Sequence, residues 1–397
     1  MKKKILLVCY GGGHVKIIKH LYPTLTNDFD VAILAFTSAR EYLKEEGIPF
    51  LSYSDFPELI GSEAARLGKE LSANMNALDL DETIAYMGVN FQELLMEHGD
   101  AKGREKYQQE GRGCFFPTRF MGGVFDVIKP DLVVATNSPR SERAALFVAK
   151  QRGIPSVCVA DNLWIGGGVL DVAKQQVASK ICVINEAMKK ELVDASAFSE
   201  QDVVVTGSPV FDSLKLRKAE WQNNKRNRST VNILYADVPL PASHPKFPEV
   251  TADPELEHDV RKVLNQLAGK ESISMTFRGH PNFNIDYSEC SNVKVSPPSE
   301  DLHELLMHTD IVITAVSTVG LEGVLLGAQL ITLENTVYRV VASYEKLAMS
   351  VGVQTADELP AALDEVLKSA EQVSSLDIYE GKATDNIKRI CHSLLSN

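Results

Sequence analysis

The chain of 397 residues is long enough for two α/β domains of ordinary size. Its formal net charge of −12 argues against nucleic acid as a partner, because a phosphate backbone is bound by a basic surface. The six cysteines show no CxxC spacing, which indicates free thiols in a reducing compartment and not a disulfide framework.

The N-terminal segment predicts a first strand and not a targeting signal. Its apolar run ends at Tyr10 before three glycines, which is too short for a signal peptide. No run elsewhere reaches the roughly 18 apolar residues of a membrane span. We therefore expect a cytoplasmic protein, with peripheral contact at the inner face of the membrane left open.

Strands and helices alternate along the first half of the chain, as in a doubly wound parallel sheet. The expected strands are nearly continuous in apolar residues, which is typical of a sheet covered on both faces, and lie at 4–10, 30–36, 130–136, 154–160, 180–184 and 202–205. Helices are expected at 15–25, 39–46, 141–151 and 186–192. Residues 57–127 are polar with a helical pattern, and we interpret them as a helical insertion that carries substrate specificity.

A second series of this kind follows the basic, polar segment 215–228, which we expect to join two domains. Because that segment also carries Trp221, contact with lipid headgroups is an alternative role for it. The second half is expected to have strands at 231–236, 272–277, 293–295, 311–315 and 330–333, and helices at 255–267, 301–308, 319–326, 356–370 and 384–395. The sequence therefore predicts an α/β chain of two Rossmann-like domains that face each other across a cleft.

One turn of the second half predicts a phosphate site. Ser317 and Thr318 lie where a helix begins, so unpaired backbone N–H groups and the helix dipole both favour an anion there. Val319 and Gly320 belong to the same turn. Glu322, one helical turn later, could accept both hydroxyls of a ribose whose diphosphate rests on the turn. The alternative is an ordinary strand–turn–helix with Ser or Thr as its N-cap.

A second anion-binding loop is predicted directly after the strand at 272–277. Arg278 and His280 can both donate hydrogen bonds to an anion, and Pro281 restricts the backbone beside His280. Together with the turn at Ser317, this loop favours a phosphate site over a simple connection.

The glycine loop after the first strand indicates acid–base chemistry. Gly12 and Gly13 allow a ligand to approach the backbone, although Lys16 breaks the G-x-G-x-x-G dinucleotide fingerprint. Because imidazole titrates near neutral pH, His14 is a candidate general base. The alternative is a glycine loop whose histidine only begins the next helix.

Three further residues are expected near the ligand because they follow strands of the first half. Asp161 could orient His14 or bind an acceptor, or could simply form the turn that ends its strand. Asn137 and Gly207 follow two other strands, and Asn137 could equally form the first turn of a helix.

No metal site is expected from the sequence. Asp79-Leu80-Asp81 matches the DxD pattern that can hold a metal and a diphosphate, but it lies in the helical insertion, where two acids at a helix start are ordinary. There is also no cluster of His and Cys with metal-ligand spacing.

Five segments carry a family resemblance over most of the chain: GGGH after the first strand, VVVTGSPVFDSL at 203–214, RGHP, VSTVGLEGVLLGAQLITLEN, and YEGKATDNI near the C-terminus. In these segments the chain resembles the GT-B fold nucleotide-sugar glycosyltransferases and their relative, UDP-N-acetylglucosamine 2-epimerase. The resemblance implies an N-terminal acceptor domain at 1–214, a C-terminal nucleotide-sugar donor domain at 215–380, and a helix at 381–397 that returns to the first domain.

The resemblance also implies roles for single residues. Ser317 and Thr318 match pyrophosphate-binding positions, Glu322 matches the ribose ligand, and His14 matches the base of inverting transferases. The pairing of a His-Pro loop with a Ser/Thr turn is also similar to capsule, sialic-acid, Kdo and teichoic-acid transferases, which use CMP- or CDP-linked donors. One departure concerns the epimerase: Ala160 lies where its His-Val-Glu-Ala-Gly motif has Glu, which favours a transferase.

The sequence-based hypothesis is therefore a glycosyltransferase of the EC 2.4 type in bacterial surface polysaccharide or glycolipid biosynthesis. It is expected to be inverting and to need neither metal nor cofactor, with His14 as base and with Arg278 and His280 neutralising the leaving nucleotide. The donor is expected to be a UDP-sugar first and a CMP- or CDP-sugar second, and the acceptor a carbohydrate or lipid-linked hydroxyl. The alternatives are a sugar-nucleotide 2-epimerase or hydrolase, which needs no acceptor, and a non-catalytic sensor; a homodimer is left open.

Overall fold

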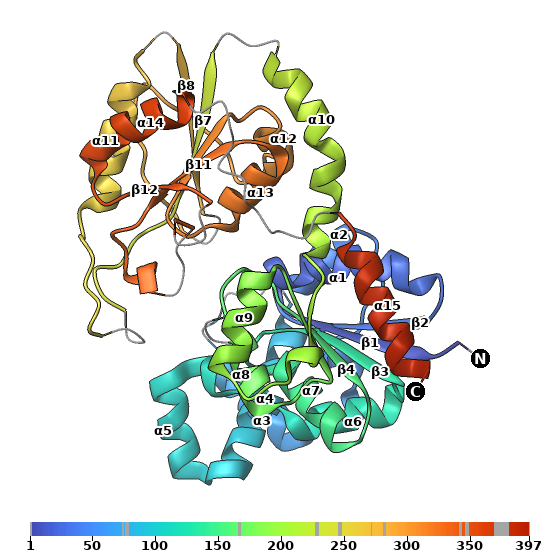
Figure 1. The fold of residues 1–397 in the computed structure, drawn as a ribbon. Coiled ribbons are helices and arrows are strands. Elements are labelled where there is room, and N and C mark those ends of the chain that lie inside the picture. Colours follow the sequence, from blue (N-terminus) through green and yellow to red (C-terminus); the bar gives the residue numbers. More distant parts are fainter. Residues whose placement is uncertain are drawn as a thin grey trace. The chain divides into compact units, whose positions relative to one another are not determined.

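The computed structural model describes residues 2–73, 75, 79–165, 168–226, 230–244, 248–270, 272–280, 283–340, 344–345, 349–368 and 381–396. The chain forms two compact units, the first made of Met1–Val210 with Lys382–Asn397 and the second of Phe211–Gly381 (Figure 1). Each unit is built on its own six-stranded parallel sheet.

The first unit has the sheet order β2-β1-β3-β4-β5-β6, with all neighbouring strands parallel. Most strand residues are buried because helices cover both faces of the sheet. This burial explains why the strand sequences are nearly continuously apolar. The strands are β1 (Lys4–Cys9), β2 (Asp30–Ala35), β3 (Leu132–Thr136), β4 (Ser156–Val159), β5 (Lys180–Val183) and β6 (Val203–Val205).

Outside the stretch between β2 and β3, the helices packed in the first unit include one from the C-terminal end of the chain. They are α1 (Gly13–Thr26), α2 (Ser38–Glu45), α7 (Ser141–Gln151), α8 (Gly168–Gln175), α9 (Glu186–Ala195) and α15 (Ala383–Ser396). Figure 1 shows α15, in red, lying among the blue and green elements of the first unit. Its buried side chains recur every four residues, and Asp28, after α1, bonds to Lys388 and His392 of α15 at 3.3 and 2.9 Å.

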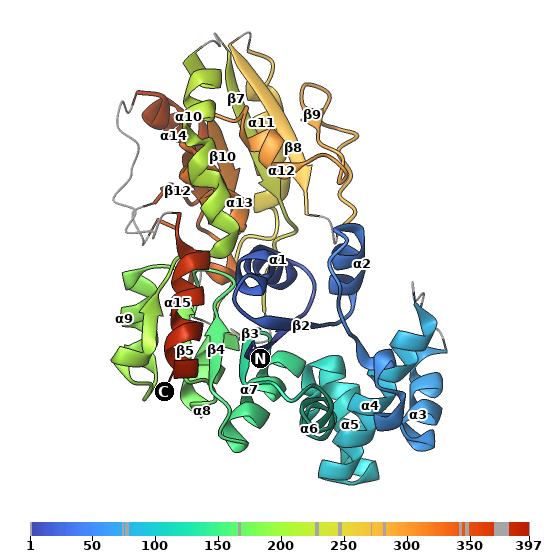
Figure 2. The ribbon, with the colours of Figure 1, turned by 90° about the vertical axis from the view of Figure 1, so that its right-hand side faces the viewer.

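The stretch between β2 and β3 is helical, as predicted. It contains η1 (Tyr53–Asp55), η2 (Pro57–Leu59), α3 (Ser62–Ser72), α4 (Leu80–His98), α5 (Asp100–Glu110), η3 (Gly111–Cys114) and α6 (Thr118–Ile128). These helices gather at one end of the first unit (Figure 2). Helices α3 and α4 touch through glycines, since a Cβ at Gly68 would lie 2.0 Å from the Ile84 carbonyl oxygen.

The second unit has the sheet order β12-β11-β10-β7-β8-β9, again entirely parallel. Its strands are β7 (Val231–Asp237), β8 (Ile273–Gly279), β9 (Lys294–Val295), β10 (Ile311–Thr314), β11 (Gln329–Leu333) and β12 (Val351–Val353). Its helices are α10 (Asp212–Arg226), α11 (Leu256–Leu267), α12 (Leu302–Leu306), α13 (Thr318–Leu326) and α14 (Leu359–Lys368), with the short turns η6 (Val337–Val340) and η7 (Ala356–Glu358). The prediction of an α/β fold with two Rossmann-like units and a helical insertion is confirmed.

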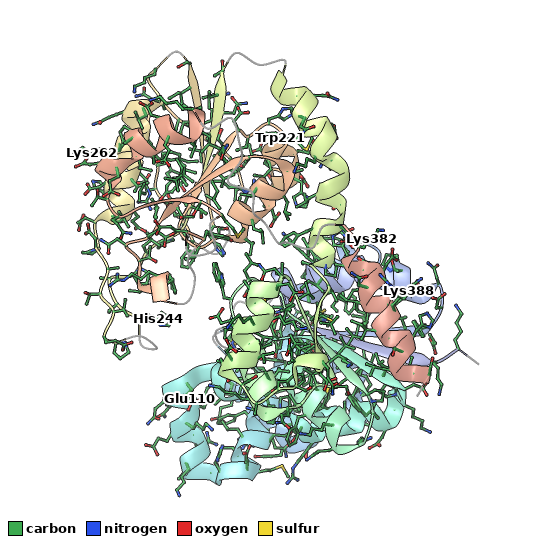
Figure 3. All side chains as sticks on the ribbon, viewed as in Figure 1. Glu110, Trp221, His244, Lys262, Lys382 and Lys388 are labelled. Atoms are coloured by element: carbon green, nitrogen blue, oxygen red, sulfur yellow. The ribbon has the colours of Figure 1, made fainter. Side chains whose placement is uncertain are left out.

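The described part of the segment 215–228 is helical and belongs to the second unit, which corrects its interpretation as a segment between domains. Most of it belongs to α10, whose Leu214 and Trp221 are two helical turns apart and both buried. Figure 3 shows Trp221 on α10. Its indole donates to the Thr309 carbonyl oxygen at 2.9 Å, and Gly327 lies against its ring. Trp221 is thus part of the packing of the second unit, which argues against the alternative of lipid contact through this side chain.

One smaller difference concerns the end of β8. Arg278 and Gly279 are the last residues of β8, because β8 pairs with β7 along its full length, and they do not begin a loop. Pro281 and the tyrosine and glutamate at 379 and 380 lie outside the described residues. Within the described part of the chain, no helix is both long and apolar enough to cross a membrane.

Candidate functional site

In the first unit, the ends of β1 and β3 bring His14 onto a chain of hydrogen bonds. His14 lies in the first turn of α1, and its Nδ1 is 2.7 Å from Thr136 Oγ1 at the end of β3. Thr136 Oγ1 in turn donates to Glu142 Oε2 at 2.7 Å, because a carboxylate can only accept. Glu142 belongs to α7 and is fully buried.

These bonds define the tautomer of His14. Since the Thr136 proton is used on Glu142, Thr136 Oγ1 must accept from His14, so Nδ1 carries the hydrogen. Nε2 of the neutral ring then has a lone pair that can take a proton. Asp161 Oδ2 lies 3.6 Å from Nε2 and would stabilise the ring once it is protonated.

Glu142 is held as a buried acceptor. Its Oε1 accepts from the Tyr10 backbone N–H at 2.7 Å, and its Oε2 accepts from the Ser138 N–H at 2.7 Å as well as from Thr136. This charge is compensated by three hydrogen bonds, which is what a buried carboxylate requires. The sequence did not reveal Thr136 or Glu142, because an acid in the first turn of a helix is ordinary whether exposed or buried.

Asp161 and Asn137 lie together after β4 and β3. The Asn137 Oδ1 accepts from the Asp161 backbone N–H at 2.9 Å, and Asn162 donates to Asp161 Oδ1 at 2.8 Å. Asn137 is buried, and a Cβ at Gly168 would lie 1.7 Å from its carbonyl oxygen. Asn137 therefore joins two strand ends by holding the backbone of Asp161, while Asn162 bonds to the Asp161 carboxylate.

The predicted glycines have distinct positions. Gly12 has φ of 73° and precedes α1, so its backbone suits glycine alone. A Cβ at Gly13 would lie 3.7 Å from Asp161 Oδ2, which places this residue beside the carboxylate. Gly207, with φ of 81°, follows β6 at the other edge of the sheet and contacts the carbonyl of Val183.

In the second unit, the turn between β10 and α13 has the predicted form. Ser317 is the N-cap of α13, and its Oγ accepts from the Val319 N–H at 3.2 Å. The Gly320 N–H bonds to the Ser317 carbonyl at 3.1 Å, and the Tyr344 hydroxyl donates to the same oxygen. An anion at this turn, next to Thr318, would therefore displace the Ser317 hydroxyl from the helix end.

Glu322 is buried and already has one partner. Its Oε2 lies 2.9 Å from His303 Nε2 on α12. Burial, with Glu322 nearby, raises the pKa of Tyr344, so this phenol stays neutral. A ribose on Glu322 would thus share the carboxylate with His303, a partner that the sequence did not suggest.

Arg278 lies near the end of β8, and His280 directly follows this strand. The Arg278 guanidinium donates to Ser296 Oγ at 2.8 Å and to the Glu300 carbonyl at 2.9 Å. Burial lowers the pKa of His280, so its ring is mainly neutral at pH 7 and acts as a hydrogen-bonding group without charge. Arg278 is therefore the cation of this pair at neutral pH.

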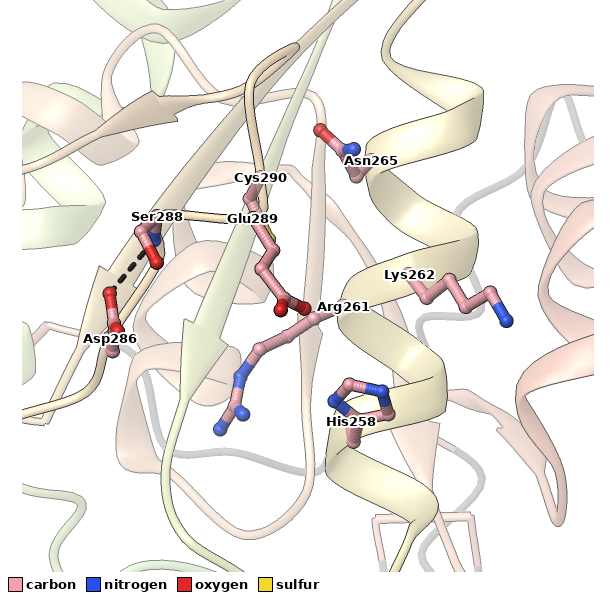
Figure 4. Close-up of a pocket in the computed structure, with 8 residues that line it drawn as sticks. All are labelled: His258, Arg261, Lys262, Asn265, Asp286, Ser288, Glu289 and Cys290. Atoms are coloured by element: carbon pink, nitrogen blue, oxygen red, sulfur yellow. Dashed lines mark hydrogen bonds between the residues drawn. The ribbon is translucent and has the colours of Figure 1, made fainter.

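A cavity of about 370 Å³ lies elsewhere in the second unit, between α11 and the loop after β8. Its wall mixes basic and acidic side chains, and none of the predicted site residues lines it; Figure 4 shows Arg261, His258 and Lys262 on α11 and Asp286, Ser288, Glu289 and Cys290 on the loop. Arg261 is held by Asp237 at the end of β7, with 2.7 Å between Nε and Oδ2.

No group of three or more His, Cys, Asp or Glu side chains among the described residues is arranged to hold a metal ion. Asp79 instead caps α4 by accepting from the Glu82 N–H, and it forms an ion pair with Arg40 at 3.0 Å.

Comparison with known proteins identifies a family for this chain. Residues 172–392, more than half of the chain, match the UDP-N-acetylglucosamine 2-epimerase family. No curated protein matches the chain at a significant level.

Solved structures of such epimerases share the fold over nearly the full length. The Methanocaldococcus jannaschii enzyme has a TM-score of 0.61 at 14% identity, with 98% of this chain and 99% of that chain covered. The Neisseria meningitidis enzyme bound to UDP-GlcNAc has a TM-score of 0.62 at 15% identity, with 99% and 100% covered. Staphylococcus aureus MnaA with UDP has a TM-score of 0.63 at 13% identity, with 100% and 98% covered.

These findings correct the functional prediction. The relation to the GT-B nucleotide-sugar superfamily is supported, but the prediction of a glycosyltransferase of the EC 2.4 type, with its transferase keywords, is contradicted by the family match. The epimerase, which Ala160 had made the less favoured alternative, is better supported by these findings. The chain belongs to the UDP-N-acetylglucosamine 2-epimerase family.

Proposed function

We propose that the protein is a UDP-sugar 2-epimerase that inverts C2 of a UDP-linked N-acetylhexosamine. The observation that carries this proposal is the series of hydrogen bonds from Glu142 through Thr136 to His14. Asp161 lies on the other side of the His14 ring. It is a proton-transfer centre at the carboxyl ends of parallel strands, where ligands of such sheets bind. The structures of relatives with UDP or UDP-GlcNAc support a UDP-sugar as the substrate.

Inversion at C2 needs only proton movement and reversible loss of UDP. A base takes the C2 proton while the C1–O bond to UDP breaks, which leaves a C1=C2 double bond. UDP then returns to C1, and a proton is added to C2 from the opposite face. Nothing is oxidised or reduced in this sequence, so we propose a reaction that needs no redox cofactor and no metal.

His14 and Asp161 are assigned the proton transfers. Nε2 of His14 has the lone pair, and the buried Glu142 stabilises the charge that the ring gains through Thr136. Ala160 is buried and cannot transfer a proton, whereas Asp161 is the next residue and faces His14. We infer that Asp161 supplies the carboxylate that the family motif places one residue earlier.

The second unit is assigned the nucleotide. The turn of Ser317, Thr318, Val319 and Gly320 would hold phosphate oxygens at the start of α13, and Glu322 would accept from the ribose. Arg278 would supply positive charge and the neutral ring of His280 a hydrogen bond.

The test is incubation with UDP-GlcNAc in the absence of any acceptor, followed by proton NMR of the sugar. We expect UDP-ManNAc to form until equilibrium, and we expect His14→Gln and Asp161→Asn to lower kcat by at least about 10²-fold. His98→Gln, in α4, is the matched control and should retain the activity. Release of UDP and free sugar without any UDP-ManNAc would contradict the epimerase in favour of a hydrolase.

A further inference from the structure

Arginines stacked on aromatic rings recur in the first unit, and one of them differs from the rest. Four of these arginines also pair with a carboxylate: Arg40 on Phe50 with Asp79, Arg104 on Phe91 with Asp100, Arg143 on Phe116 with Asp171, and Arg152 on Phe125 with Asp126. Arg140 lies over the Tyr10 ring at 4.3 Å, yet no carboxylate of the described residues lies within 4.0 Å of it. The half-buried guanidinium of Arg140 therefore stacks on Tyr10 but has no anionic partner among the described residues.

The groups in direct contact with Arg140 are the phenols of Tyr10 and Tyr86. Its Nη1 donates to the Tyr86 hydroxyl at 3.4 Å, and the Tyr10 hydroxyl bonds to Tyr86 and to Ser141. Burial raises the pKa of Tyr10, so this phenol does not ionise near neutral pH. Glu142 attracts the guanidinium at longer range, but its oxygens accept from other donors.

Burial alone would lower the pKa of Arg140, but Tyr10, Tyr86 and Glu142 raise it overall, so the side chain stays a cation. An arginine offers several N–H groups in one plane. An incoming carboxylate or phosphate can take two of them at once, which fixes both its position and its orientation. Arg140 thus has the properties of a binding group that is complete only with an anionic ligand.

Its position connects it with the proton-transfer centre. Arg140 follows β3 and is the N-cap residue of α7, between Thr136 and Glu142 in the chain. Tyr10, on which it stacks, donates its backbone N–H to Glu142. Arg140 and the hydrogen-bonded side chains of His14, Thr136 and Glu142 therefore lie at the same carboxyl end of the sheet.

We propose that Arg140 binds an oxyanion of the nucleotide-sugar substrate, and that this oxyanion is a carboxylate on the sugar. The inference rests on the proposed function and deepens it: the substrate class is a UDP-linked N-acetylhexosaminuronic acid. The diphosphate of the substrate could also supply an oxyanion for Arg140, but the proposed function assigns the diphosphate to the turn at Ser317. A neutral sugar would leave the guanidinium without its anion.

The test compares kcat/KM for UDP-GlcNAc and for the same nucleotide sugar with a carboxylate at C6. We expect the unmodified protein to prefer the acid, and Arg140→Met to lower the ratio of acid to neutral substrate about 10- to 100-fold, since a charged hydrogen bond is lost. Arg140→Lys should restore part of the ratio. Arg143→Met removes a stacked arginine that already has a carboxylate partner, so it should leave the ratio unchanged.

Binding measurements separate this inference from the proposed reaction. In a His14→Gln background, dissociation constants for both sugars and for UDP report on Arg140 whether or not turnover occurs. A preference for the acid that disappears with Arg140→Met supports the inference even if no epimerisation is found. An unchanged ratio overturns it, and weaker binding of UDP itself in Arg140→Met would overturn the sugar carboxylate in favour of the diphosphate.

Discussion

At the scale of single residues, the properties of His14 depend on a hydroxyl that the sequence did not single out. Thr136 accepts from His14 and donates to Glu142, so it sets the tautomer that leaves Nε2 able to take a proton. A glycine loop followed by histidine indicates that His14 is a candidate. The tautomer follows only from contacts between β1, β3 and α7.

Thr136→Val tests this role directly. Valine has the shape of threonine without the hydroxyl, so His14 loses its acceptor and the buried Glu142 loses a donor. We expect kcat to fall about 10- to 100-fold and KM to change little. Thr136→Ser, which keeps the hydroxyl, is the control, and equal activity of the Val and Ser variants would show that the relay has no part in catalysis.

His280 predicts a dependence of stability on pH. Because burial lowers its pKa, the unfolded chain binds a proton more readily than the folded chain below about pH 6.5. The contribution of His280 to stability is therefore complete above that pH and is lost as the pH falls toward the lowered pKa. In His280→Gln, we expect Tm to fall less between pH 7.5 and pH 5.5 than in the unmodified protein; parallel losses in both would refute this assignment.

At the scale of elements, glycines determine how closely α13 packs on its sheet. A Cβ at Gly323 would lie 2.6 Å from Val312 Cγ2 on β10, and one at Gly320 would lie 2.9 Å from Leu330 Cδ1 on β11. Real Cβ atoms do not approach other atoms so closely, so α13 or its neighbours would have to move. The turn at Ser317 keeps its place because α13 can lie directly on these strands.

Gly323→Ala is expected to destabilise the protein by about 1–3 kcal/mol through overpacking, although alanine favours a helix. Denaturant unfolding monitored by circular dichroism measures the change. Gly269→Ala is the matched control in the same unit, since its Cβ would meet the nearest atom at an ordinary 3.5 Å. Equal stability of the two variants would mean that α13 can shift without cost.

Helix α10 shows where sequence patterns fail at this scale. Its 15 residues are mostly polar and charged, so the sequence shows no clear apolar period, although Leu214 and Trp221 are buried. The strands were predictable because full burial makes them continuously apolar, as in β1 and β10. A polar helix with one buried ring looks like a linker until its tryptophan is seen to bond to Thr309.

At the scale of the whole molecule, the α/β architecture of both units could be predicted from alternation of strands and helices. The reaction could not, because transferases and epimerases on this fold bind the same class of ligand at similar short turns. The loss of the motif glutamate at Ala160 favoured a transferase, whereas the structure places the Asp161 carboxylate against His14. Under the proposed function, the carboxylate of the family motif would have shifted by one residue, which a motif read position by position does not reveal.

The most direct test of the proposed function is transfer of hydrogen between solvent and C2 of the sugar. The protein would be incubated in D2O with UDP-GlcNAc, and separately with the corresponding C6 acid, and C2 would be followed by proton NMR and mass spectrometry. Epimerisation through loss of the C2 proton predicts that the product, and then the recovered substrate, carry deuterium at C2. Two results would contradict the assignment of C2 inversion to this protein. One is turnover of either sugar with protium retained at C2, and the other is no turnover of either sugar.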